Sequence, residues 1–209
     1  NLPGARVLAL DPKGTLLVSL PDEGTVVALP NHGSDGKADR VITVLDGLDR
    51  PHGILILCGN TGFESVDQDN CTLFVAEQHR VAAYRYDADT MSAIFEKTLM
   101  ALPSSGGHNT RSLYLTPDAS RLLVAVGSSC NVCNEEAERR AAIHAINLTT
   151  GTTSLYARGL RNTVFLTTHP VDGSTWGTEM GRDLLGDELP PDEVNVIREG
   201  ANYGWPICY

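Results

Sequence analysis

The sequence contains no apolar run of about 18 residues or more, so it offers no segment that could cross a bilayer as a helix. Its first residues, NLPGARVLAL, also lack the charged start and long apolar stretch of a signal peptide. Basic residues are few and scattered: 16 Lys and Arg stand against 26 Asp and Glu, and the net charge is −10. Because phosphate-rich partners need clustered positive charge, we expect neither a nucleic acid nor an anionic membrane as a partner.

The hydrophobic residues of the sequence are numerous enough to form a packed core. The chain has 209 residues, of which 42% are hydrophobic, a composition typical of one globular domain or part of one. Five cysteines and two glycosylation sequons, at Asn70 and Asn147, fit a secreted glycoprotein. We therefore expect a secreted, extracellular protein.

The cysteines have different contexts. Cys58 and Cys71 flank a polar loop between two apolar runs, which predicts a disulfide that closes a hairpin and stabilises it by roughly 3 kcal/mol. Cys130 and Cys133 fit a small disulfide, a redox pair or half of a zinc site, and the zinc reading lacks a second CxxC. Cys208 is left without a partner, which suggests that its partner lies beyond the end of this sequence.

Short apolar runs recur with turn residues between them. One strand, turn and strand phrase occurs three times, as ALDPKGTLLVS (9–19), YLTPDASRLLVAV (114–126) and TTHPVDGSTWGTE (167–179), each with an Asp or Gly turn. No convincing amphipathic helix is present, so we predict an all-β fold. A period of roughly 50 residues per four strands is typical of a β-propeller. At that period the sequence supplies about three and a half blades, and the exposed edges of so short a ring suggest part of a larger chain.

Five segments resemble the sorbosone/glucose dehydrogenase family, quinoproteins that include soluble aldose dehydrogenases and fungal pyranose dehydrogenases. The segments are RPHGIL (50–55), GGHNTRSLYLTPD (106–118), VGSSCNVCNE (126–135), RRAAIHAIN (139–147) and the whole of 156–209. The resemblance implies a six-bladed β-propeller, of which this chain covers roughly the first three to four blades. It also implies two cofactors, pyrroloquinoline quinone (PQQ) over the central channel and calcium bridging PQQ to the protein.

His108 corresponds to the catalytic histidine of that family. An imidazole titrates near neutrality, so it can accept the proton of a sugar C1 hydroxyl; the alternative is a structural or surface histidine. Gly107 stands where the bacterial glucose enzymes carry an acid, so the sequence does not name the group that orients the ring. Arg161 and Asn162 are neighbours before a strand-like run, where alternation would send them to opposite faces unless the strand end bends or bulges. The resemblance places both against PQQ, with Arg161 stabilising charge on the reduced cofactor.

The acidic segment after Met180 has two readings. It fits a solvated loop, since its spacing is not that of an EF-hand, whereas the resemblance implies that the carbonyls of Gly181 and Arg182 bind calcium. Family members carry a proline at or near Arg182, and a carbonyl ligand survives that change. A second, structural calcium region is implied at Asp192, Glu193 and Tyr203.

Three further residues are assigned by weighing structural against functional roles. His52 either contacts the substrate or caps a strand. Trp205, in NYGWP, is expected to pack in the core, and Trp176 is expected to stabilise a blade.

The favoured function is therefore a PQQ- and calcium-dependent dehydrogenase. It would oxidise an aldose, pyranose or osone at C1 and pass electrons to a one-electron acceptor such as a cytochrome. A calcium-dependent propeller lactonase would need metal-binding carboxylates from several blades, whereas the acids gather in one late loop. A non-catalytic propeller scaffold predicts loss of His108 or Arg161, and both are present.

Overall fold

The computed structural model describes residues 2–33, 35–59 and 71–208. These residues form fifteen β-strands, and no helix that could span a membrane is found among them. The strands are β1 (Leu8–Leu10), β2 (Leu16–Leu20), β3 (Thr25–Leu29), β4 (Ile42–Leu45), β5 (Ile54–Cys58), β6 (Cys71–Ala76), β7 (Arg80–Asp87), β8 (Ser92–Ala101), β9 (Arg111–Leu115), β10 (Arg121–Val126), β11 (Ala142–Asn147), β12 (Thr153–Arg158), β13 (Thr163–Thr168), β14 (Thr175–Glu179) and β15 (Glu193–Ile197).

Each sheet is an antiparallel meander in chain order, as in a propeller blade. Strands β1–β4, β5–β8 and β9–β12 form four-stranded sheets, and β13–β15 form a three-stranded one. The predicted all-β, propeller-like architecture is confirmed, with four blades in the described residues.

The three repeated phrases form the first hairpin of their sheets. They pair β1 with β2, β9 with β10, and β13 with β14. In each turn an aspartate Oδ1 accepts a backbone N–H two residues on, from Lys13 to Asp11 at 2.9 Å, from Ser120 to Asp118 at 3.2 Å, and from Ser174 to Asp172 at 2.9 Å. The predicted Asx turns are therefore present.

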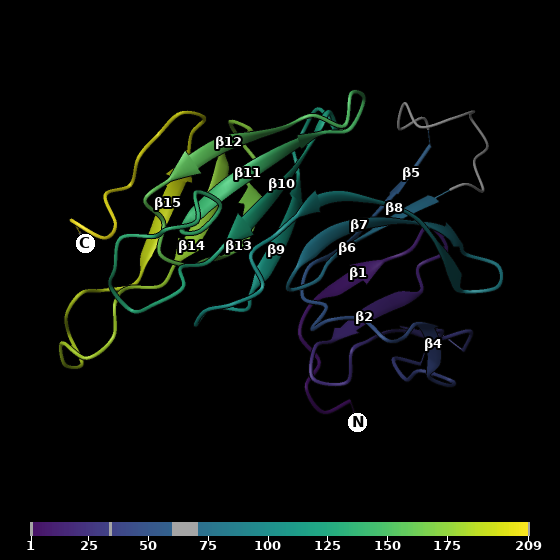
Figure 1. Cartoon of the computed structure of the whole chain (residues 1–209). Helices are drawn as coiled ribbons and strands as arrows, with labels where there is room; N and C mark the ends of the chain where they lie inside the picture. The colour runs from purple at the N-terminus through teal and green to yellow at the C-terminus, as the bar shows by residue number, and fades with distance from the viewer. Residues whose placement is uncertain (1, 34, 60–70, 209) are drawn as a thin grey trace. The chain divides into compact units, whose positions relative to one another are not determined.

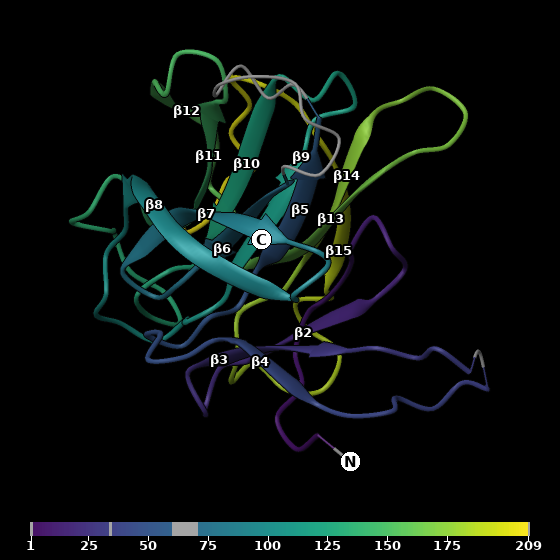
Figure 2. The same cartoon turned by 90° about the vertical axis from the view of Figure 1, so that its right-hand side faces the viewer.

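The chain divides into two compact units, residues 1–101 and 102–209. In the first unit, β1 contacts β5 and β4 contacts β8, so the sheet β1–β4 lies beside the sheet β5–β8 (Figure 2). Buried side chains from both sheets form one core. Leu17, Leu73 and Val75 are among its fully buried members. The Tyr86 hydroxyl, buried in the same core, donates a 3.0 Å hydrogen bond to Asp11 and so ties the first Asx turn to β7.

In the second unit, β13 packs beside β9 (Figure 1). Its core contains the buried side chains of Leu123, Ile143, Leu160 and Ile197. Strand β14 lies between β13 and β15. Its Trp176 stacks on His169 at 5.6 Å, which agrees with the blade-stabilising role predicted for it.

The predicted hairpin disulfide is confirmed. Cys58 and Cys71 are bonded and are paired in the register of β5 and β6. We expect the double substitution of Cys58 and Cys71 by alanine to lower the free energy of unfolding by roughly 3 kcal/mol, because the closed loop restricts the unfolded chain. Urea unfolding with and without a reducing agent measures this: the reducing agent should destabilise the wild type, and an equal midpoint for wild type and variant without it would contradict the prediction. Asn70, the first sequon, lies outside the described residues.

Candidate functional site

Arg161 and Asn162 lie at a strand end that bends. Gly159, with φ +70°, turns the chain before them, and the pairing of β13 with β14 shifts register between Thr163 and Leu166. The strand end is thus irregular on both sides of the pair, which agrees with the condition under which two adjacent polar residues need not lie on opposite faces. Both side chains are almost completely buried, with 3% of Arg161 and 2% of Asn162 exposed.

The Arg161 guanidinium is saturated by groups of the protein. Nε donates to the Asn131 carbonyl at 3.0 Å, Nη1 to the Gly181 carbonyl at 2.7 Å, and Nη2 to Asn131 Oδ1 at 3.0 Å and Asp183 Oδ2 at 2.6 Å. The Asp183 side chain is 67% exposed, whereas that of Arg161 is 3% exposed. The predicted contact of Arg161 with a cofactor therefore requires exchange of a partner, and the exposed Asp183 carboxylate is the simplest to displace.

A buried carboxylate joins the two segments of the site. Glu179, at the end of β14, accepts hydrogen bonds from the Asn162 backbone N–H and the Thr163 hydroxyl, both at 2.6 Å. Burial raises the pKa of Glu179 to about 7, and these two hydrogen bonds oppose the shift. Since Met180 and Gly181 follow directly, Glu179 fixes the strand end at 162 relative to the segment that begins at 180.

His108 is half-buried, and one of its nitrogens is held. Nδ1 lies 2.9 Å from both the carbonyl and the hydroxyl of Ser128. The Ser128 hydroxyl donates its own hydrogen to the Cys130 carbonyl at 2.6 Å, so both Ser128 groups act as acceptors toward the ring. The neutral imidazole must therefore carry its hydrogen on Nδ1. Its Nε2 keeps a lone pair and has no hydrogen-bond partner among the described residues, as a general base requires.

Two buried arginines fix the backbone of His108. Arg111 donates to the carbonyls of His108 at 3.0 Å and Pro103 at 2.8 Å. Arg140 donates to the same two carbonyls at 3.3 and 3.2 Å, and to that of Gly127 at 3.2 Å. The segment before β9 is thus held by charge-assisted hydrogen bonds.

Gly127 leaves the space in which His108 and Asn162 approach each other. A Cβ on Gly127 would lie 2.4 Å from Asn162 Oδ1 and 2.6 Å from His108 Cβ. The absence of a side chain there lets Asn162 and His108 pack against the same backbone. Asn162 Oδ1 is held there by the Thr110 hydroxyl at 2.7 Å.

The segment predicted to bind calcium offers backbone oxygens. The Gly181 carbonyl accepts Arg161 Nη1, and the Gly181 N–H donates to Asp192 Oδ1 at 3.0 Å. A carbonyl has two lone pairs, so this one retains an acceptor site, and oxygen ligands of this kind suit calcium. Asp192 thus anchors the proposed ligand segment.

The calcium-binding role of Asp192, Glu193 and Tyr203 stays a prediction. The Tyr203 hydroxyl donates to the Val196 carbonyl at 2.6 Å and accepts from the Arg198 N–H at 2.8 Å. Among the residues the structure describes, three acidic or metal-binding side chains come together at Cys130, Cys133 and Glu135, and no such cluster includes Asp192 or Glu193. The two cysteines are bonded to each other, which excludes them as zinc ligands in this state and fits both a small disulfide and the oxidised form of a redox pair.

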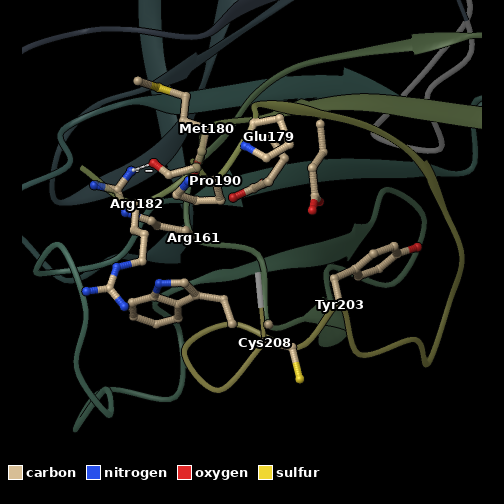
Figure 3. Close-up of a pocket in the computed structure, with 12 residues that line it drawn as sticks. Arg161, Glu179, Met180, Arg182, Pro190, Tyr203 and Cys208 are labelled. Atoms are coloured by element: carbon tan, nitrogen blue, oxygen red, sulfur yellow. Dashed lines mark hydrogen bonds between the residues drawn. The ribbon is translucent and has the colours of Figure 1, made fainter. Parts of the chain in front are cut away.

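A pocket adjoins Arg161 and Gly181 (Figure 3). Its wall includes Trp205, which the sequence assigned to the core; it is instead only partly buried. The Trp205 Nε1 is nevertheless shielded and has no hydrogen-bond partner among the described residues. An orphaned N–H here fits a bound group that carries acceptor oxygens. The pocket is lined by Gly159, Arg161, Glu179, Met180, Gly181, Arg182, Pro190, Pro191, Glu193, Tyr203, Trp205 and Cys208.

A model of the TrAA12-like family matches residues 1–209, the full length of the sequence. The chain belongs to the TrAA12-like family. Among curated proteins, the chain is 30% identical over 175 residues to an uncharacterized protein of Borreliella burgdorferi, covering 83% of this chain and 45% of that protein. It is 26% identical over 180 residues to a pyrroloquinoline quinone-dependent sugar dehydrogenase of Hypocrea jecorina, covering 69% and 41%. The TrAA12-like chain thus spans less than half the length of these relatives.

Solved structures share the fold. The calcium structure of a Trichoderma reesei enzyme of Carbohydrate-Active Enzymes Family AA12 is 24% identical, with a TM-score of 0.81 over 99% of this chain and 56% of that one. The holo form of the PQQ domain of a pyranose dehydrogenase from Coprinopsis cinerea is 19% identical, with a TM-score of 0.77 over 99% and 55%. The family resemblance inferred from the motifs is confirmed.

His52 of the TrAA12-like chain lies in the first unit and is 3% exposed. Its Nε2 accepts a hydrogen bond from Arg6 Nε at 3.3 Å, and its backbone N–H donates to the Ala76 carbonyl at 2.9 Å. These contacts fit the strand-capping reading, and a contact of His52 with substrate stays a prediction.

Several site residues of the TrAA12-like chain escaped the sequence analysis. They come from four different segments, so proximity along the chain does not reveal them: Arg111, Gly127, Ser128, Asn131, Arg140 and Glu179. A usable signal existed, because all six lie within the segments that carried the family resemblance.

Two buried histidines should each make the TrAA12-like chain less stable on mild acidification. Burial lowers the pKa of His108 and of His144, and the nearby charges of Arg161 and Arg139, respectively, act in the same direction. These histidines take up protons more readily in the unfolded chain as pH falls below about 6.5, so their contribution to the free energy of unfolding decreases. Glu179, whose pKa is raised to about 7, acts in the opposite direction, so the histidine effect is measured by comparing variants. Between about pH 7.5 and 5.5 the urea midpoint of His144→Gln should fall less, or rise more, than that of the wild type, and an equal change in both would contradict the assignment.

Proposed function

We propose that the protein containing this chain oxidises a sugar (an aldose, a pyranose or an osone) at C1, with PQQ and calcium as cofactors. The observation that carries the proposal is the His108 imidazole, whose Nδ1 hydrogen is held by Ser128 and whose Nε2 is left as a base. The names of the relatives support the chemistry, since one is a PQQ-dependent sugar dehydrogenase.

The residues present fit the two cofactors. Gly181 and Arg182 would hold calcium through their carbonyls, and Arg161 and Asn162 would hold PQQ, Arg161 after releasing Asp183. The unpartnered Trp205 Nε1 beside Gly181 is a further donor for a carboxylated ligand. When bound, PQQ supplies the two-electron acceptor for the C1 hydride and calcium polarises it.

The protein's own contribution is proton removal and orientation. His108 Nε2 accepts the proton of the C1 hydroxyl, and Ser128 keeps the ring in the tautomer that permits this. The buried guanidinium of Arg161 provides positive charge beside the site. We further propose six blades for the whole protein, secretion, and a one-electron acceptor such as a cytochrome domain or protein.

The test is reconstitution of the whole protein. PQQ and calcium are added separately and together, PQQ binding is followed by absorbance, and sugar-dependent dye reduction is measured. Activity that requires both additions supports the proposal. No PQQ binding by the whole protein would sink it and would favour the calcium lactonase, which is assayed on sugar lactones in parallel, or a binding scaffold.

A further inference from the structure

The four-residue loop from Cys130 to Cys133 lies between the two functional side chains of the site. It follows β10 and belongs to no strand, so ladder hydrogen bonds do not fix it. The bond between Cys130 and Cys133 closes it into a small ring instead. Loops of this kind are usually the mobile part of a site, and a covalent link removes much of that freedom.

The ring's first contact leads to His108. The Cys130 carbonyl accepts the Ser128 hydroxyl hydrogen at 2.6 Å. That bond turns the Ser128 oxygen into an acceptor for His108 Nδ1 at 2.9 Å. The Ser128 carbonyl alone already requires a hydrogen on Nδ1, so the Cys130 carbonyl acts by making the Ser128 hydroxyl a second acceptor for that hydrogen, which helps to fix the ring.

The ring's second contact leads to Arg161 through Asn131. The Asn131 carbonyl accepts Arg161 Nε, and Oδ1 accepts Nη2, both at 3.0 Å. The same Oδ1 accepts the Asp183 N–H at 2.7 Å, and the Asn131 amide donates to the Asp183 carbonyl at 2.9 Å. One side chain thus fixes both the guanidinium and the segment after Arg182.

We infer that the disulfide-closed loop Cys130–Cys133 positions the base and the guanidinium together, and that Asn131 is the positioning residue for Arg161. The expected effect on PQQ binding rests on the proposed function. The positioning of the two side chains concerns the protein without cofactor and does not depend on it. The ring offers a paired acceptor to two nitrogens of one planar group, which sets the orientation of the guanidinium as well as its place.

Two variants separate the contacts. Asn131→Ala removes the side-chain contacts to Arg161 and Asp183 and leaves the Ser128 to Cys130 contact in place. The double variant C130S/C133S opens the ring and loosens both. The matched controls are Asn134→Ala, an exposed neighbour of the loop, and C58S/C71S, which opens the disulfide of the first unit.

Two measurements are made on the whole protein. Side-chain NMR without cofactor reports hydrogen exchange of the Arg161 Nη2–H groups, which contact the Asn131 side chain, and of the His108 Nδ1–H. Titration with PQQ in the presence of calcium reports affinity. We expect Asn131→Ala to speed the Arg161 exchange by about tenfold or more and to weaken PQQ by about tenfold, with the His108 exchange unchanged. The ring-opened variant should show both effects together with faster exchange of the His108 Nδ1–H, and neither control should show any.

Each outcome decides the inference. If wild type binds PQQ and both loop variants bind it equally well with unchanged NMR signals, the inference is wrong while the proposed function stands. If no form binds PQQ but the NMR signals change as expected, the proposed function fails and the positioning role of the loop stands. If C58S/C71S changes the same NMR signals and the PQQ affinity to the same extent as the loop variants, the effect is a general loss of stability and the inference is wrong.

Discussion

Replacing His108 with alanine is expected to lower sugar-dependent dye reduction by two or more orders of magnitude, the scale of lost general-base catalysis. PQQ binding should change far less, because the residues that would hold the cofactor, Arg161 and Asn162, keep their own partners in this variant. Steady-state rates at saturating sugar, with PQQ affinity measured in parallel, separate the two effects.

A matched control is available for this experiment. His32 is an exposed histidine in the first unit, paired with Asp39 at its surface, and His32→Ala should leave the rate unchanged. If His108→Ala reacts at more than about a tenth of the wild-type rate, His108 is not the base. Since the Ser128 hydroxyl is one of two acceptors that hold the Nδ1 hydrogen and its carbonyl remains in the variant, Ser128→Ala should fall between wild type and His108→Ala, with its loss in the rate and not in the affinity for PQQ.

Gly127→Ala should disable the site by a different route. The added methyl would stand 2.4 Å from Asn162 Oδ1 and 2.6 Å from His108 Cβ, closer than real Cβ contacts allow, and both neighbours are held by hydrogen bonds. We expect a hundredfold or greater loss of activity, because even small displacements of catalytic groups are costly. Overpacking should also lower the free energy of unfolding by about 1–3 kcal/mol. Dye reduction and urea unfolding measure the two losses.

The control for that variant is Gly33→Ala. A methyl group at Gly33 meets nothing within 4 Å, and its backbone is not left-handed, so neither activity nor stability should change. Wild-type activity in Gly127→Ala would show that the backbone at 127 yields and that His108 and Asn162 do not depend on this close approach.

Local features were predictable from the sequence where one segment determines them. Each Asp turn needs only a carboxylate and a backbone N–H two residues on, so the repeated phrase identified three hairpins. Cys58 and Cys71 were predictable because two strands of opposite direction bring the ends of their loop together. An irregular strand end at Arg161 was suggested by two polar neighbours, which a regular strand would send to opposite faces.

The remainder of the site depends on contacts between segments. Ser128 is an ordinary loop serine until β9 and β10 bring it beside His108. Arg111 has no exposed surface although arginine is generally a surface residue, because the preceding loop folds back and offers it the carbonyls of Pro103 and His108. Gly127 resembles any turn glycine, but its role is to leave space. Trp205 was assigned to the core because an aromatic ring followed by proline usually packs, whereas here it borders a pocket.

The second sheet differs from the other three at its first hairpin. Where β1–β2, β9–β10 and β13–β14 are joined by short Asp turns, β5 and β6 are joined by a longer segment with Cys58 and Cys71 bonded at its base. The disulfide holds the ends of β5 and β6 together, so the pairing of these two strands does not depend on how many residues lie between the two cysteines. Adding residues there costs little, because the closure entropy of a loop grows only slowly with its length. Between Cys58 and Cys71 the chain should therefore accept an inserted peptide without any change to the rest of the blade.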